Sequence, residues 1–312
     1  MNTMTAFPEL KSTGVNLDLD HVDFLKESAS VASDVETLRQ RMTTHGYLYM
    51  PGLLKRDRVL DARRSICQVM QDGGFLDDSK PMMEAIPNPK KGIGFKPEYA
   101  TGNPVVEKLL YTGEMIEFFD RFFGKPTMHY DFTWLRTVSP GSGTPSHCDV
   151  VYMGRGETQQ LFTVWTPLGD IDFAQGGLMV LDGSNRYDPL KRNYGQHDVD
   201  TFCTNKEKQD GWRDGIKWLP DSDVKGTSGS IGNDPNAIRN AVGGTWRTTE
   251  FKAGDALIFT CYTVHASLDN TSDRIRLSTD SRYQPSGTVL DERWVGSNPI
   301  AHSQAGKRGK IC

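Results

Sequence analysis

The chain has few cysteines, no long apolar run and no excess of basic charge, and each of these absences excludes a class of protein. Its 312 residues include five cysteines, an odd and scattered set that argues against a disulfide framework and a structural zinc site. No run approaches the roughly 20 apolar residues that span a bilayer. The net charge of −4 offers no basic surface for nucleic acid or an anionic membrane. Because the first residues also lack the plan of a signal peptide, we expect a cytoplasmic protein without a nucleic-acid or membrane partner.

What the chain does contain is the composition of a globular protein, with 37% hydrophobic and 24% charged residues. Residues 1–33 are polar and show no period, so we interpret them as an N-terminal tail or an irregular cover, and residues 34–312 as a single domain. Apolar residues then recur at helical spacing. This pattern predicts helices over 35–45, 57–70 and 104–123, with a strand at 47–50 after the first helix.

Beyond residue 127 the apolar residues alternate with polar ones, which is typical of strands. Strands are expected at about 127–135, 161–165, 178–181, 246–251, 256–261 and 275–283. Helices followed by strands indicate an α+β protein with a β-sandwich or barrel core. The pattern breaks over 186–244, and because a structureless loop of that length is unusual, we expect a partly ordered insertion that covers a pocket. A mobile lid, a rigid decoration and an oligomer contact are all compatible with its composition.

Two histidines and an aspartate have the residue types of an iron site. His147 and Asp149 are separated by one residue, Cys148, so period two places their side chains on one face and the thiol on the other. His265 follows a later apolar strand. Two imidazoles and one carboxylate form the facial triad that leaves three open positions on non-haem Fe(II). A His-x-Asp tripeptide arises often by chance, so the surrounding residues have to support this hypothesis.

Ser267 and Arg276 follow His265 at short spacing and offer a site for an anion. A turn between two strands would return the arginine beside the metal. A guanidinium holds a carboxylate through two hydrogen bonds, and a nearby hydroxyl adds a third. These groups suit the distal carboxylate of a dicarboxylic keto acid whose other end chelates iron. Arg274 shares the face of Arg276 by period two and competes for the same role.

The stretches between these residues resemble the phytanoyl-CoA dioxygenase family of Fe(II)/2-oxoglutarate oxygenases, from about residue 43 to 285. The matching phrases are Gly46-Tyr47, Trp165-Thr166-Pro167-Leu168, the run from Gly176 to Asn185, and Ala253-Gly254-Asp255. The resemblance implies that His147, Asp149 and His265 bind iron. It also implies that Arg276, eleven residues after the second histidine, binds 2-oxoglutarate, which decides between the two arginines.

The resemblance further implies a double-stranded β-helix, the jelly-roll core shared with cupins, with flanking N-terminal helices. Ser267 and Trp165 match positions of the family near the cosubstrate. His129 and Thr163 lie where contacts with 2-oxoglutarate are expected. Arg282 has two interpretations, a residue facing the active site or a buried ion pair with an acidic neighbour such as Asp280.

The predicted function is a dioxygenase that uses Fe(II), 2-oxoglutarate and O₂ to hydroxylate, or otherwise oxidise, a C–H bond of a small-molecule substrate, with release of succinate and CO₂. The presence of Asp149 favours hydroxylation over halogenation, because the related halogenases lack the metal carboxylate. Two alternatives stay open: a cupin-like metal-dependent oxygenase or isomerase that does not use 2-oxoglutarate, and a non-catalytic binding protein on the same scaffold. The sequence identifies neither the substrate nor the oligomeric state.

Overall fold

The structure, a computed structural model, describes residues 7–202 and 215–308, and its strands form two main sheets. The larger sheet consists of β4 (Tyr47–Met50), β5 (Thr127–His129), β6 (Trp134–Val138), β7 (Phe162–Pro167), β10 (Ala256–Thr260) and β12 (Arg276–Pro285). The smaller sheet consists of β3 (Val22–Phe24), β8 (Leu178–Leu181), β9 (Trp246–Thr248) and β11 (His265–Ser267). A separate hairpin joins β1 (Lys11–Ser12) to β2 (Val15–Asn16).

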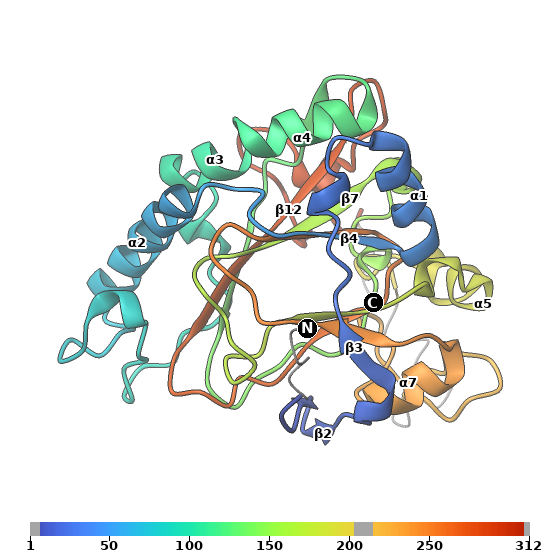
Figure 1. Cartoon of the computed structure of the whole chain (residues 1–312), viewed down its shortest axis with the longest axis horizontal. Coiled ribbons are helices and arrows are strands. Elements are labelled where there is room, and N and C mark those ends of the chain that lie inside the picture. The colour runs from blue at the N-terminus through green and yellow to red at the C-terminus, as the bar shows by residue number, and fades with distance from the viewer. Residues whose placement is uncertain (1–6, 203–214, 309–312) are drawn as a thin grey trace.

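Most of the helical residues precede or interrupt these strands. The helices are α1 (Val35–His45), α2 (Arg56–Asp72), α3 (Pro104–Leu110), α4 (Glu114–Phe123), α5 (Asp188–Arg192) and α7 (Pro235–Val242). Helices α1 to α4 lie on one side of the larger sheet, while β3 and α7 lie on the other side (Figure 1). The predicted mixture of helices and strands is therefore confirmed. Within the described residues, none of the helices has the length and apolar character needed to cross a bilayer.

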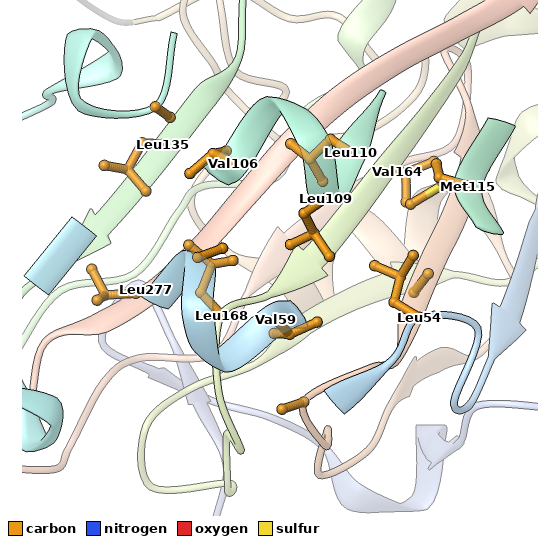
Figure 2. Packing of buried hydrophobic residues seen from close by; sticks show 14 of the residues in the cluster. Leu54, Val59, Val106, Leu109, Leu110, Met115, Leu135, Val164, Leu168 and Leu277 are labelled. Carbon is orange, nitrogen blue, oxygen red and sulfur yellow. The ribbon is translucent and has the colours of Figure 1, made fainter. Parts of the chain in front are cut away.

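Side chains alternate along a strand, so the two faces of the larger sheet carry different residues. The outer face is apolar, while the inner face is polar along β12 and apolar along β4 and β10. Leu277 of β12 and Val164 of β7 belong to the core cluster shared with the helices, among them Val106 and Leu109 of α3 (Figure 2). The intervening residues of β12, including Arg276 and Arg282, are buried on the opposite face of the sheet. The outer face thus attaches the sheet to the helices, and the inner face is free to carry functional groups.

Two of the predicted elements are divided in the structure. The helix expected over 104–123 becomes α3 and α4, because Gly113 adopts φ of 61°, which a right-handed helix cannot contain. The strand expected over 127–135 becomes β5 and β6. Between them the backbone N–H groups of Asp131 and Phe132 donate to the carbonyl of Trp294, so a distant segment replaces the sheet as their partner. Neither interruption has a periodic signal, since each depends on one backbone conformation or one long-range contact.

The interpretation of residues 1–33 as a tail is wrong for the described residues 7–33. Strand β3 pairs in parallel with β9 and so extends the smaller sheet. The Ser12 hydroxyl donates to the carbonyl of Ser267 at 2.8 Å, and the N–H of Asp269 donates to the carbonyl of Lys11 at 2.7 Å. This polar segment lacks a period because it contributes short pairings and turns, not a long amphipathic element.

The insertion over 186–244 is ordered wherever the structure describes it. Tyr194 and Trp218 are buried in the second core cluster, so these side chains are already packed and not available to fold over a ligand. The hydroxyls of Tyr152 and Tyr194 both donate to the carbonyl of Gly229, at 2.7 and 2.9 Å. The described part of the insertion is therefore attached to the domain as a wall. Trp212, which also belongs to the insertion, lies outside the described residues.

A buried ion cluster attaches the segment after β12 to the start of the insertion. Arg293 is fully buried and donates to Asp291, Asp198 and Asp200, with N–O distances of 2.6 to 3.0 Å. Arg155 donates to the other oxygen of Asp198 at 2.6 Å. Removing one partner of such a cluster leaves buried charges without a counter-ion. This destabilises the fold far more than the loss of a surface ion pair.

We expect Arg293→Met to lower the free energy of unfolding by about 3–5 kcal/mol, because three carboxylates lose a buried partner. The matched control is Arg308→Met, whose side chain is 59% exposed and pairs with Glu292. That exposed pair should contribute at most about 1 kcal/mol. Urea denaturation of both variants measures the difference in unfolding free energy. Similar losses of stability in the two variants would contradict a stabilising role for this ion cluster.

Candidate metal centre and adjoining cavity

Three side chains converge where the smaller sheet meets the larger one. His147 and His265 exchange two backbone hydrogen bonds of 3.0 Å, which places their imidazole centroids 4.1 Å apart. The Nε2 atoms of His147 and His265 lie 3.9 and 3.7 Å from Oδ1 of Asp149. One donor atom from each of the three residues lies within 4.8 Å of the others, and all three residues are buried. Two imidazoles and one carboxylate in this arrangement suit a divalent first-row metal such as non-haem iron.

The orientation of each imidazole is set by a backbone carbonyl. Nδ1 of His147 lies 2.8 Å from the carbonyl of Pro145, and Nδ1 of His265 lies 3.0 Å from that of Thr263. Because a carbonyl oxygen only accepts, each Nδ1 carries the hydrogen and each Nε2 keeps its lone pair for a metal. Burial, followed by the nearby His265, lowers the pKa of His147 to about 3, so this imidazole is neutral at neutral pH. A neutral ring is the form that binds a metal.

Asp149 is oriented by the larger sheet. Its Oδ2 accepts hydrogen bonds from the Thr163 hydroxyl and, at 3.0 Å, from Nη2 of Arg282, which leaves Oδ1 facing the histidines. Burial acts to raise the pKa of Asp149, but Arg282, the two histidines and the Thr163 hydroxyl together outweigh it and lower the pKa below its usual value. The carboxylate is therefore ionised, as a metal ligand must be.

The alternation of side chains that the sequence predicts for His147 and Asp149 holds, although neither residue lies in a strand. Cys148 has φ of −120° and ψ of 146°, so the chain is extended there, and Asp149 then begins a short 3₁₀ turn, Asp149–Val151. The Cys148 thiol points away from the triad and lies 3.4 Å from the carbonyl of Tyr262. One extended residue is enough to place His147 and Asp149 on the same side.

Arg276 lies at the start of β12 and is 1% exposed. Within the part of the chain that the structure describes, its Nε and Nη1 atoms have no hydrogen-bond partner. Burial lowers the pKa of Arg276 to about 10, which still leaves it charged at neutral pH. Trp165 and Ser278 carry unpartnered buried donors on the same inner face, and the guanidinium lies 5.8 Å from the Trp165 ring centroid. A buried cation with free N–H groups fits a carboxylate ligand such as that of a keto diacid.

Arg274 is not placed to compete for that ligand. It is exposed, and its guanidinium lies 3.8 Å from the carboxylate of Asp273. The parity argument that joined Arg274 to Arg276 is wrong, because β12 begins only at Arg276 and the preceding residues form a bend. Ser267, in contrast, is buried on β11 and accepts a hydrogen bond of 2.8 Å from the N–H of Thr144, so its hydroxyl hydrogen remains available.

Two expected cosubstrate contacts are placed elsewhere. The Thr163 hydroxyl is engaged by Asp149, so Thr163 acts on the metal carboxylate. His129 stacks on Tyr111 with centroids 4.1 Å apart and pairs in register with Tyr283, whose side chain faces the helices. His129 therefore lies on the outer face of the sheet, opposite the triad. The alternation of side chains along the strand would have predicted this orientation of His129 if the register of β5 against β12 had been known.

Arg282 faces the site, as one of its two interpretations supposed, but its partner is Asp149 and not Asp280. Asp280 pairs instead with Arg136, whose Nε lies 2.7 Å from Oδ2 of the carboxylate. The guanidinium of Arg282 also lies over the ring of Trp134, 4.0 Å from its centroid. Arg136 belongs to no motif in the sequence. Only its position two residues after Trp134 on the same strand could have indicated that its side chain faces the site.

A cavity of about 440 Å³ adjoins the triad at His147 and Asp149. Its wall is built from distant parts of the chain, including Trp134 of β6, Ser230 of the insertion and His302 near the C-terminus. The insertion contributes Thr227, Gly229, Ser230 and Asn233 to this wall. No local sequence pattern indicated His302, because its position depends on the ion cluster around Arg293 that holds the C-terminal segment in place.

Comparison with known proteins adds a family to this geometry. Residues 42–278 match the family model described as phytanoyl-CoA dioxygenase. The chain is 23% identical over 280 residues to 1-deoxypentalenic acid 11-beta-hydroxylase from Streptomyces exfoliatus, covering 86% of each protein. Among solved structures, it resembles EctD from S. alaskensis with bound Fe, with a TM-score of 0.55, 15% identity and coverage of 97% of this chain and 93% of that one.

A second solved structure is the epimerase SnoN in complex with Fe3+, alpha ketoglutarate and nogalamycin RO. The TM-score is 0.54 with 17% identity, covering 86% of this chain and 93% of that one. At these identities the structural likeness establishes the fold, while the family match spans most of the chain. The chain therefore belongs to the phytanoyl-CoA dioxygenase family and is an iron- and 2-oxoglutarate-dependent oxidoreductase.

Proposed function

We propose that this enzyme hydroxylates a C–H bond of a small molecule bound in the cavity beside His147 and Asp149, and releases succinate and CO₂ from 2-oxoglutarate. The observation that carries the proposal is the pairing of two features on one inner surface. A buried His-Asp-His triad has its donor atoms turned together, and a buried Arg276 has two N–H-bearing atoms without partners. The first feature suits iron, and the second suits the far carboxylate of a chelating keto diacid.

We also infer that the two sheets form the jelly-roll core, a double-stranded β-helix, that the family resemblance implies. The antiparallel pairing of β12 with β7, of β7 with β10 and of β8 with β11 is compatible with this arrangement. In such a core the ligands project between the sheets. Arg282 and Thr163 from the larger sheet meet the two histidines of the smaller-sheet side at Asp149, which supports the inference.

In this scheme each residue has a defined task. His147, Asp149 and His265 hold iron, while Arg276 holds the distal carboxylate of 2-oxoglutarate, with the Ser267 hydroxyl as a further donor. With iron and 2-oxoglutarate bound, O₂ would be the oxidant: one oxygen atom would go into succinate as 2-oxoglutarate loses CO₂, and the other would go into the hydroxylated C–H bond. Arg282 and Thr163 keep Oδ1 of Asp149 directed at the metal. The walls formed by Trp134 and residues 227–230 exclude water from the reacting atoms.

Hydroxylation is the outcome that we favour over other oxidations. The curated relatives at 23% identity are hydroxylases, and the metal carboxylate Asp149 is present. An iron protein that does not use 2-oxoglutarate, or a non-catalytic binding protein, would have no need for the buried Arg276, whose Nε and Nη1 atoms have no partner among the described residues.

Succinate release separates these three functions. The iron-loaded enzyme should convert 2-oxoglutarate to succinate slowly alone and faster with a true substrate. Succinate formation measured by chromatography, with and without O₂, checks the expectation. A protein that binds iron but never forms succinate would be a metal enzyme of another kind, and a protein that binds no iron would be a binding protein.

Asp149→Ala should weaken Fe(II) binding by more than about 100-fold and abolish succinate release. Loss of a residue that only orients a ligand already costs about 10–100-fold in metal affinity, so loss of the ligand itself should exceed that. The matched control is Asp273→Ala, a carboxylate whose side chain is 82% exposed. Metal content after dialysis and a Fe(II) titration measure the effect; near-normal binding by Asp149→Ala would remove the triad assignment.

Arg276→Gln should weaken 2-oxoglutarate binding by about 100-fold while leaving iron binding intact. Hydrogen bonds to charged groups contribute about 1.5–3 kcal/mol each, and each 1.4 kcal/mol is a factor of ten. Arg274→Gln, two residues away and exposed, should leave the 2-oxoglutarate titration unchanged. The reverse ranking of the two variants would assign the anchor to Arg274 and contradict the role of Arg276.

A further inference from the structure

We propose that the substrate is an apolar molecule with a single carboxylate group, and that Arg136 binds this carboxylate. The inference rests on the proposed function and names the substrate class of the same site. Arg136 stands on β6, where it pairs in register with Ser278 on β12, so its side chain lies on the inner face of the larger sheet. It lines the same cavity as His147 and Asp149. A ligand held by Arg136 would therefore lie beside the metal triad.

The guanidinium of Arg136 is only half engaged by the protein. Its Nε donates to Oδ2 of Asp280 at 2.7 Å. Among the described residues, Nη1 and Nη2 have no hydrogen-bond partner, and the side chain is 31% exposed. Asp280 thus fixes one edge of the planar group and leaves the two Nη atoms available. Two N–H groups on one edge match the two oxygens of a carboxylate.

The charges on the inner face point to one more anion. Three guanidinium groups, those of Arg136, Arg276 and Arg282, accompany two carboxylates, those of Asp149 and Asp280. Iron(II) brings two positive charges, and 2-oxoglutarate brings two negative charges, so bound cofactors do not remove the imbalance of one positive charge. Arg282 also lines the cavity, and among the described residues its Nε and Nη1 atoms have no partner, but its side chain is 1% exposed and its Nη2 donates to Asp149. Arg276 does not line the cavity. Arg136, whose side chain is 31% exposed, is therefore the cation that a substrate can reach most fully.

The rest of the wall suits an apolar body. Trp134, Tyr152 and Met153 line the cavity beside the triad. Phe95 lies at the mouth, 54% exposed and 5.8 Å from the guanidinium of Arg136. The volume of about 440 Å³ falls within the range of about 300–1,000 Å³ that is usual for small-molecule sites.

A multiply phosphorylated carrier fits this wall poorly. No lysine of the described residues lines the cavity. Lys91 donates to the carbonyl of Gly73, and Lys96 pairs with Glu98 at 3.4 Å. The remaining titratable ring on the wall, His302, has its Nδ1 engaged by Asp200 at 2.9 Å. The single positive charge of the Arg136 guanidinium matches the charge of one carboxylate, whereas a chain of phosphates would carry several negative charges.

Matched pairs of acids and amides test the proposal. The probes are cyclohexane-, 1-adamantane- and 1-naphthalenecarboxylate with their neutral primary amides, titrated by calorimetry into the enzyme loaded with Fe(II) and 2-oxoglutarate without O₂. For at least one pair the carboxylate should bind about tenfold tighter than the amide, since a charge-assisted pair of hydrogen bonds is lost in the amide. Arg136→Gln should abolish this preference, Arg136→Lys should keep part of it, and Arg274→Gln should keep all of it.

The visible absorption of the iron–2-oxoglutarate chelate is recorded in the same samples. It distinguishes a failure of the proposed function from a failure of the role of Arg136. If this absorption never forms in the wild type, the proposed function fails. If it forms and no pair shows a preference for the acid, or no probe binds, the role of Arg136 is overturned. Loss of the absorption on adding a carboxylate would place the probe at the iron or at Arg276 and also overturn the proposal. An intact absorption in Arg136→Gln shows that the variant is folded, so its loss of preference counts in favour.

Discussion

The position of the Asp149 carboxylate is the constraint on which the whole site depends. One of its oxygens is held by Thr163 and Arg282 of the larger sheet, and the other faces the two histidines. A buried carboxylate is tolerated only when it is paired and hydrogen-bonded, so neither sheet can move without breaking one set of contacts. The same contacts keep the carboxylate ionised and aimed. The contacts that fix the two sheets relative to each other are thus the same contacts that hold the metal ligands in position.

The alternation of side chains along a strand allows a charged interior in a stable fold. The outward residues of β12 and β7 are buried among the helices in the first core cluster. A second cluster packs around the insertion and the segment before the metal ligands. A third cluster, which includes Trp165, Leu257 and Phe259, fills part of the layer between the sheets, so the three arginines and two aspartates of that layer lie beside apolar packing. The outer face of β12 thus carries apolar packing, and its inner face carries the charged groups.

The cavity wall draws on more of the chain than the metal triad and Arg276 do. The metal triad and Arg276 all lie within the region that matches the family model. His302 lies beyond its end, and Thr227 and Ser230 belong to the long insertion. The ion cluster around Arg293 fastens the C-terminal segment to the start of the insertion, which places His302 and the insertion on one wall.

The amino-acid sequence by itself determined the residue types of the site and most of the elements that carry them. Helix α1, which Asp34 caps through the N–H of Thr37, and strand β8 follow directly from periodicity and capping, because these signals are local. The residues proposed for iron and 2-oxoglutarate were also readable, since an extended His-x-Asp and the family spacing after His265 are short-range features. Even the splitting of the 104–123 helix had a local cause in Gly113, although its φ could not be read from the sequence.

Only the tertiary structure decided which polar residues meet. Arg282 pairs with Asp149 and Arg136 with Asp280 because of the register of β12 against β6 and β7, which no single segment encodes. His129 faces the helices for the same reason, and His302 reaches the cavity through contacts of a distant ion cluster. Periodicity assigns a side chain to one of two faces, but the register between strands, set by the packing of the whole sheet, determines which neighbours it finds there.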